Sequence, residues 1–396
     1  MYFSLKIYHQ KRICSISFLI IGCKGKHFLL IIQQNLAQTI TEKFFQLLRG
    51  AIGAGNDEAT VEVSPEDWEQ IYRIARQQSL LGVLFYGIQR CAEVKPERKL
   101  LLKWYSLSEK IKQGNMKANR AAVELTEFFR REGFRSCVLK GQGNTLNYPA
   151  PHVRTSGDID LWVEGGAEVV LAFARRFVPG SKFCYHHIEF RKVDGVETEV
   201  HYRPSFMNNL VHNWRMQRWF DEVADEQFRH EVELPEGAGR VCVPTHGFNR
   251  IYQMSHISNH VFHEGIGLRQ IVDYYFVLRQ GFTEEERLRD ERLLRRLGLY
   301  DMAAAVMYVL QTTLHLGEEL MIVPANRRLG TFLLNELLEG GNFGRYDQRV
   351  GHSRSAWAKN VRRLRRDVRM MWYFPSECLW EPVFRWFHFF WRVRYR

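Results

Sequence analysis

The 396-residue sequence lacks the pattern of a disulfide framework. Its seven cysteines are an odd number, and no two of them form a Cys-x-x-Cys pair. Small secreted domains that depend on disulfides carry even numbers of cysteines at regular spacing. Several cysteines here lie in apolar runs, such as Cys137 in the stretch 136–139. We therefore expect reduced, buried thiols and a cytoplasmic protein.

The apolar run near the N-terminus is too short to span a bilayer. Residues 13–23 are eleven residues long, whereas a spanning helix needs about 20. This run lies within residues 1–35, which contain five basic residues and no acidic one. Three interpretations of residues 1–35 stay open: a gene start placed too far upstream, a signal or anchor segment without a clear cleavage site, and a genuine structural element.

The composition also argues against whole-chain disorder and against a nucleic-acid-binding body. Hydrophobic residues make up 45% and charged residues 25% of the chain, which are ordinary values for globular proteins. The net charge is +12, but residues 1–35 and 345–396 contribute +5 and +9, so residues 36–344 sum to −2. Because this middle part is slightly acidic, nucleic acid is not the expected partner.

The hydrophobic periodicity changes twice along the chain. A helical pattern from residue 36 to 132 includes a helix start at 64–67, with Ser64 as the cap. Residues 133–204 then alternate strand, helix, strand, helix and a hairpin whose turn is Asp194-Gly195, the strongest short-range hairpin pattern. Helical patterns return over 205–344, including one that opens with a capping sequence at Thr283. We expect an α+β fold in which a small mixed sheet, 133–204, is flanked by helical regions at 36–132 and 205–344.

Acidic side chains at one end of this expected sheet suggest a cation site. Asp158 and Asp160 are two residues apart on a strand, so their side chains point to the same face. A third carboxylate from a neighbouring strand would complete a site for two metal ions, as used in phosphoryl and nucleotidyl transfer. Glu199 and Glu197 on the hairpin are the two candidates, and we prefer Glu199.

Upstream, a strand ends in Lys140-Gly141-Gln142-Gly143 and leads into a short helix. Such a turn presents backbone N–H groups and a helix N-terminus to phosphates, and Lys140 could contact a triphosphate as a point charge. Arg154 has two equal interpretations, either neutralising phosphate charge or pairing with a carboxylate to order the loop.

Several motifs in this order resemble a known family. They read Leu139-Lys140-Gly141, Tyr148-Pro149, Arg154 to Leu161 with its Asp-Ile-Asp-Leu, and Glu199-Val200-His201. The chain resembles the uncharacterised bacterial nucleotidyltransferase family, within the superfamily that shares the DNA polymerase β-like fold. The resemblance implies Mg²⁺ or Mn²⁺ held by Asp158, Asp160 and Glu199, and an NTP held by Lys140, Gly141, Gly143 and Arg154. Two departures, Gln142 in place of a second small residue and a long gap before Asp158, weaken the phosphate cradle more than the metal site.

The resemblance extends into the helical segment with His260 and residues 267–273. His201, His260, Arg269 and Asp273 are therefore expected to contact the nucleotide or the acceptor. His256, His260 and His263 lie on one helix face, but the acid of a zinc-protease motif is absent, so we expect a polar cleft wall or ordinary packing. Asp273 is alternatively the partner of Arg269 one turn earlier.

The C-terminal region 345–396 differs from the rest. Apolar residues at helical spacing between 357 and 371 alternate with arginines, and an aromatic, arginine-rich tail follows Pro375. Peripheral contact with an anionic membrane surface through 357–396 and simple packing onto the globular body are both open. The first would place the protein at the inner face of the membrane.

We expect an enzyme that transfers a nucleoside monophosphate from an NTP to a hydroxyl of an unknown acceptor, such as a small molecule or glycan precursor, and releases pyrophosphate. The alternative from another class is a non-catalytic or membrane-peripheral protein that keeps the fold as a binding scaffold. The complete set of three carboxylates favours the enzyme. A transferase acting on RNA would be supported by salt-dependent binding that is lost without 345–396.

Overall fold

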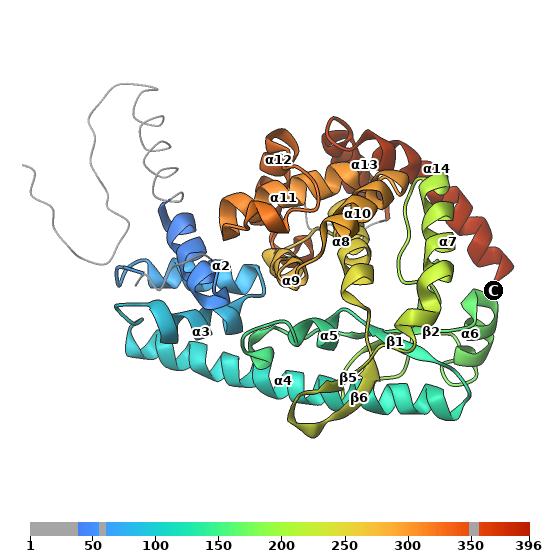
Figure 1. Cartoon of the computed structure of the whole chain (residues 1–396), viewed down its shortest axis with the longest axis horizontal. Helices are drawn as coiled ribbons and strands as arrows, with labels where there is room; N and C mark the ends of the chain where they lie inside the picture. The colour runs from blue at the N-terminus through green and yellow to red at the C-terminus, as the bar shows by residue number, and fades with distance from the viewer. Residues whose placement is uncertain (1–38, 55–60, 348–355) are drawn as a thin grey trace, which may run out of the picture. The chain divides into compact units, whose positions relative to one another are not determined.

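The structure is a computed structural model that describes residues 39–54, 61–347 and 356–396, with no side-chain description for 356–359 (Figure 1). The chain divides into two units, Met1–Glu42 and Lys43–Arg396. Residues 39–42, the described part of the first unit, are helical. The predictions for residues 1–35 and for the side chain of Trp357 lie outside what is described. Every helix and strand labelled in Figure 1 belongs to the second unit.

The N-terminal part of this unit is helical, as predicted. Residues 43–52 are helical, followed by α2 (Trp68–Gln77), α3 (Leu81–Cys91) and the long α4 (Arg98–Arg131). The predicted cap at Ser64 is wrong, because residues 64–67 form a turn and Asp67 occupies the N-cap position of a helix that begins at Trp68. The Asp67 carboxylate is instead paired with Lys43 at 2.6 Å, which explains why no side-chain cap forms.

The predicted mixed sheet is confirmed. Its strands are β1 (Ser136–Leu139), β2 (Ile159–Val163), β3 (His187–Glu189) and β4 (Thr198–His201), arranged in the order β1-β2-β4-β3. β2 and β4 run parallel, and the other two pairs are antiparallel. The hairpin turn at Asp194-Gly195 is present, with φ of 48° and 77°, although its strands are shorter than expected. The connections are α5 (Gly141–Thr145), a 3₁₀ turn (Pro151–Val153) and α6 (Gly166–Arg175).

The two faces of the sheet have different roles. Ile159, Leu161 and Val163 of β2 belong to a hydrophobic core that includes residues of α4 and α6. The alternate residues point to the other face, where the Trp162 ring lies 5.9 Å from that of Phe248. Figure 1 shows α4 running along one side of the sheet, with α8 on the other. The period-2 alternation therefore directs Asp158 and Asp160 away from the core and towards the C-terminal helices.

The C-terminal region is mostly helical and also contains a second, two-stranded sheet, which contacts α4 and β1. Its elements are α7 (Leu210–Gln227), β5 (Glu231–Leu234), β6 (Gly239–Cys242), α8 (His246–His263), α9 (Leu268–Leu278), α10 (Glu284–Arg296), α11 (Tyr300–Leu314) and α12 (Arg327–Gly340), with 3₁₀ turns at Pro235–Gly237, Glu318–Leu320 and Asn342–Gly344. The expected cap at Thr283 is present as a capping box with Glu286. Residues 246–278 form two helices, α8 and α9. They separate at Gly265, where φ is +97° and a Cβ would lie 2.7 Å from the Gly344 nitrogen.

The aromatic C-terminus is helical rather than a tail. α13 (Ala356–Met371) is followed by α14 (Pro375–Arg394), which includes Pro382. Phe384 and Trp391 of α14 are buried in the core of the mixed sheet, and the Phe384 ring stacks on Phe206 at 5.0 Å. Within the part of the chain that is described, no helix has both the length and the hydropathy needed to cross a membrane.

Candidate functional site

Three carboxylates converge at one end of the mixed sheet. Asp160 on β2 lies directly opposite Glu199 on β4 in the parallel register, and Asp158 immediately precedes β2. One oxygen from each carboxylate lies within 4.8 Å of the others. The expected triad therefore forms, and Glu199 rather than Glu197 supplies its third member. Glu197 is exposed and pairs with Lys192.

The three carboxylates of the triad repel one another electrostatically. The charge of Asp160, helped by partial desolvation and by Glu199, raises the pKa of Asp158 to about 6. Like charges at short range disfavour ionisation, so a cation placed among these oxygens would relieve the repulsion. Asp158 is exposed and Asp160 is buried, so a ligand from the cleft would meet Asp158 first.

Two basic side chains already flank the buried Asp160. The Lys140 ammonium lies 3.0 Å from one carboxylate oxygen, and His201 Nε2 lies 2.9 Å from the other. Burial raises the pKa of Asp160, but Lys140 and His201 outweigh it and hold that pKa well below its ordinary value. Burial also opposes ionisation of His201, yet its bonds to Asp160 and Glu199 raise its pKa to about 9. The predicted substrate residue His201 is thus a charged partner of the triad.

The triad opens into a cleft of about 230 Å³. The sheet, the loop before β2, and helices α8 and α9 all contribute to its wall. The expected site residues that line it are Lys140, Gly141, Arg154, Asp158, Asp160, Glu199, His201, His260, Arg269 and Asp273. Of the expected residues, Gly143 is outside this lining: a Cβ there would lie 3.1 Å from Val243, so Gly143 faces the β5–β6 hairpin.

The turn after β1 has an unusual backbone. Lys140 adopts φ of 52° and ψ of −135°, a combination that costs a non-glycine residue of order 1–3 kcal/mol and is often found at functional sites. From this turn the Lys140 side chain extends to Asp160. α5 has only five residues, so its dipole is small, and the expectation of phosphate binding at this turn rests on Lys140 and Gly141.

Arg154 forms a buried ion pair with a carboxylate, which is one of the two interpretations open from the sequence. Its Nε and Nη2 donate to the two carboxylate oxygens of Asp273, each at 2.7 Å, and Tyr148 donates to the same carboxylate at 2.7 Å. Both charged side chains are about 6% exposed. This bidentate pair connects the loop before β2 to α9, so the structure places Arg154 in an ordering contact.

Other contacts fix the same loop. Asn115 of α4 donates to the carbonyl oxygens of His152 and Arg154, at 3.0 and 2.7 Å. Arg269 donates to the Thr155 carbonyl at 3.2 Å rather than pairing with Asp273 at hydrogen-bond distance, and its guanidinium lies 5.8 Å from the Phe343 ring. The long loop before Asp158 is therefore held in place by these hydrogen bonds and forms part of the cleft wall.

The histidines of α8 form part of the opposite wall. His256 Nδ1 lies 3.5 Å from the Lys140 ammonium, and His256 and His260 are 3.0 Å apart through their Nε2 atoms. His260 also contacts Glu264 at 3.2 Å. The expectation of a polar cleft wall holds for this face, and among the described residues no three-ligand metal group includes these histidines.

Sequence reasoning missed three residues beside the triad. Cys184, His186 and His187 are grouped just before and at the start of β3, and His187 Nδ1 lies 3.1 Å from Glu199. The pattern Cys-x-His-His on one turn is the signal that could indicate them. It is weak, because each of these residues alone is ordinary in a strand.

Comparison with known proteins agrees with this geometry. Residues 64–316 match the model of a family described as uncharacterised nucleotidyltransferase. The chain belongs to this nucleotidyltransferase family. The match covers the sheet, the triad and the helices around the cleft. No curated protein matches the chain.

A solved structure shows a distant likeness. It is an antigenic nucleotidyltransferase-like protein from Paracoccidioides brasiliensis, 14% identical, with a TM-score of 0.32 over 54% of this chain and 96% of that one. A TM-score of this size carries no argument about function.

The donor set of the triad suits a hard divalent cation. All three ligands are carboxylate oxygens, which Mg²⁺ and Mn²⁺ prefer. Nucleotidyltransferases generally use divalent metals, and the raised pKa of Asp158 shows that the cluster lacks counter-charge. The residues present therefore fit Mg²⁺ at this position.

Proposed function

We propose that the protein is an Mg²⁺-dependent nucleotidyltransferase that transfers a nucleoside monophosphate from an NTP to a hydroxyl of a small molecule or glycan precursor. The observation that supports this most is the convergence of Asp158, Asp160 and Glu199 within 4.8 Å at the cleft. Two Mg²⁺ ions held there, or Mn²⁺ in their place, would supply charge stabilisation for the reacting phosphate and the departing pyrophosphate.

The chain's own residues have separate tasks in this reaction. Lys140, 16% exposed at the cleft, is the cation placed to contact the triphosphate. Glu199, whose carboxylate has a lowered pKa despite burial, accepts the proton of the acceptor hydroxyl. The acceptor oxygen forms a bond to the α-phosphorus as the bond to the pyrophosphate oxygen breaks. His201 holds Asp160 and Glu199 in position.

The alternative is a scaffold that keeps the fold without catalysis. An enzyme releases pyrophosphate when Mg²⁺, labelled NTPs and a metabolite extract are supplied together, and it leaves a nucleotidylated product. We expect this from the wild-type chain and not from Asp158→Asn. Mg²⁺-dependent NTP binding without product from any extract would instead support the scaffold.

Nucleotide binding should depend on the metal. A non-hydrolysable NTP analogue at about 100 times its dissociation constant stabilises a folded protein by about 2.7 kcal/mol. With Mg²⁺ present we expect a rise in Tm of several degrees, measured by scanning fluorimetry. With EDTA, or in Asp158→Asn, the rise should vanish. An equal rise with EDTA would argue against a metal-dependent site.

Helix α14 supports peripheral membrane contact. While one face packs on the core, the other exposes apolar side chains at helical spacing: Leu379, Val383, Trp386, Phe390 and Val393, which are 46–67% exposed. Four exposed arginines on and just beyond the same helix, Arg385, Arg392, Arg394 and Arg396, provide charge complementary to anionic lipid. Packing on one face and lipid contact on the other are thus compatible.

A vesicle experiment tests this contact. Trp386→Ser with Phe390→Ser should weaken partitioning onto anionic vesicles at least tenfold, since burying one such side chain is worth about 1.5–3 kcal/mol. The matched control is Leu102→Ser with Tyr105→Ser, which removes side chains 56% and 49% exposed on α4. Equal flotation of both double variants would contradict the proposal.

A further inference from the structure

A tight turn before β3 gathers one sulfur and two imidazoles. The Cys184 N–H donates to the His187 carbonyl at 2.9 Å, which closes the turn. Tyr202, following β4, fixes it from the other side: its N–H donates to the His186 carbonyl at 3.0 Å, and its hydroxyl donates to the His187 carbonyl at 3.1 Å. The three side chains are therefore presented from a backbone that is already ordered.

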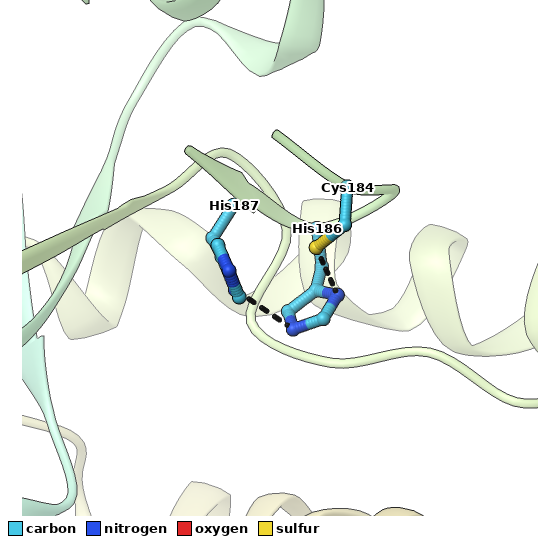
Figure 2. A group of neighbouring side chains, drawn as sticks. All are labelled: Cys184, His186 and His187. Carbon is cyan, nitrogen blue, oxygen red and sulfur yellow. Dashed lines mark hydrogen bonds between the residues drawn. The ribbon is translucent and has the colours of Figure 1, made fainter. Parts of the chain in front are cut away.

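The side chains point to one another rather than apart. Figure 2 shows Cys184 and His187 both directed at the ring of His186. Cys184 Sγ lies 3.3 Å from His186 Nδ1, and His186 Nε2 lies 3.0 Å from His187 Nδ1. One ligand atom from each residue lies within 4.8 Å of the other two. Because the two contacts use opposite nitrogens of the His186 ring, binding one tetrahedral ion requires this ring to rotate so that a single nitrogen approaches the other two ligand atoms.

The chemistry of these donors differs from that of the carboxylate triad. Thiolate and imidazole select zinc and related transition metals, whereas Mg²⁺ prefers oxygen. Three protein ligands with one position left open are typical of reactive zinc sites, and four protein ligands of structural ones. Among the described residues, no further Cys or His joins this group within the same distance, so the arrangement corresponds to an open site.

We propose that Cys184, His186 and His187 bind one zinc-class divalent cation at the edge of the nucleotidyltransferase cleft. On binding, the Cys184 thiol releases its proton to solvent, and the sulfur coordinates as thiolate. His186 and His187 line the cleft, so an ion held by them would be reachable from it. This cation is separate from Mg²⁺ at the carboxylates, and the site does not depend on the proposed transfer reaction.

Glu199 connects the two sites. Its carboxylate lies 3.1 Å from His187 Nδ1 and is also the third member of the triad. The same nitrogen faces His186, so Glu199 lies at the edge of the proposed site. The cation would therefore lie one side chain away from the group that receives the acceptor proton, where its open position could bind an acceptor oxygen.

Cobalt substitution tests the site on the full chain. The protein is stripped with EDTA and titrated with Co²⁺, and the thiolate-to-cobalt charge-transfer band is followed; Zn²⁺ affinity is then measured by competition with a chromophoric chelator. We expect the band in the wild type, with an intensity that saturates at one thiolate-bound ion per chain. Cys184→Ser should abolish it and weaken Zn²⁺ binding by more than the ~10–100-fold that loss of an outer partner costs.

The chain offers matched controls. Cys242→Ser changes another half-buried free cysteine that lies outside the cluster, so the band should remain. His187→Gln, which keeps the thiol, should weaken Zn²⁺ binding while the melting curve stays cooperative. Absence of the band in the wild type, or its persistence in Cys184→Ser, would overturn the proposal. So would Zn²⁺ binding that is lost in Asp158→Asn but kept in Cys184→Ser.

Discussion

Asp158→Asn is expected to lower Mg²⁺-dependent pyrophosphate release by about 10²–10³-fold, the loss typical of removing one group that stabilises transition-state charge. The substitution preserves side-chain size and removes one of the three cation ligands. It also removes the repulsion that raises the pKa of Asp158 to about 6. The melting temperature should therefore be unchanged or higher, measured beside the rate.

Asp158 is a better test than Asp160 because of its surroundings. Asp160 is buried between Lys140 and His201, and removing a buried charge leaves its partners uncompensated. Loss of activity in an Asp160 variant would thus mix catalysis with folding. Asp158 is exposed to the cleft, so a fall in rate at unchanged Tm reports on the site itself.

The hairpin provides a matched pair of glutamates. Glu199 side-chain exposure is 25% and that of Glu197 is 64%, although they are only two residues apart. Glu199→Gln should lose activity to a similar degree as Asp158→Asn, while Glu197→Gln should keep it. Full activity in Asp158→Asn and Glu199→Gln would remove the basis of the proposed function.

Arg154→Ala should cost about 3–5 kcal/mol of folding stability, as found when one partner of a buried ion pair is removed. Without Arg154, the one donor left to the buried Asp273 carboxylate among the described residues is Tyr148, at 2.7 Å. Chemical denaturation would report this as a lower midpoint. As a control, Arg120→Ala breaks an exposed pair with Asp194 and should cost at most about 1 kcal/mol.

Lowering the pH should reduce the difference in folding stability between the wild type and Arg154→Ala. Burial raises the pKa of Asp273, but the charge and hydrogen bonds of Arg154 outweigh it, so the net pKa is lowered. The stability from this pair is present above the unfolded value of about 4 and is lost as pH falls through the lowered folded pKa. Unchanged stability in Arg154→Ala, together with a raised KM for the NTP, would instead assign Arg154 to phosphate binding.

Local sequence patterns predict the sheet and its triad. The two-residue period of β2 places Asp158 and Asp160 on one face, and the Asp194-Gly195 turn folds Glu199 back beside them. These are short-range effects, since they need only strand alternation and turn chemistry. Strand alternation and the turn therefore predict the two aspartates and a third carboxylate from the hairpin. They place Glu197 and Glu199 on the same face, and the choice of Glu199 comes from the Glu199-Val200-His201 pattern of the family resemblance.

Contacts between distant segments could not be predicted in this way. Arg154 and Asp273 are separated by 119 residues, and nothing in either segment distinguishes an ion pair from a phosphate contact. Gly143 turns towards Val243 because the β5–β6 hairpin packs there, a result of tertiary packing. Which side chains of α14 are buried likewise depends on tertiary contacts, such as the stacking of Phe384 on Phe206.

Lys140 has a consequence for the order in which ligands arrive. Its ammonium, 3.0 Å from Asp160, is a tethered counter-ion that, together with His201, offsets part of the negative charge of the triad. A free metal ion would have to compete with the Lys140 ammonium for the Asp160 carboxylate. A metal–nucleotide complex would also bring phosphates, to which the ammonium could bind instead. If the proposed function holds, the site would therefore bind a metal–nucleotide complex more readily than the free ion.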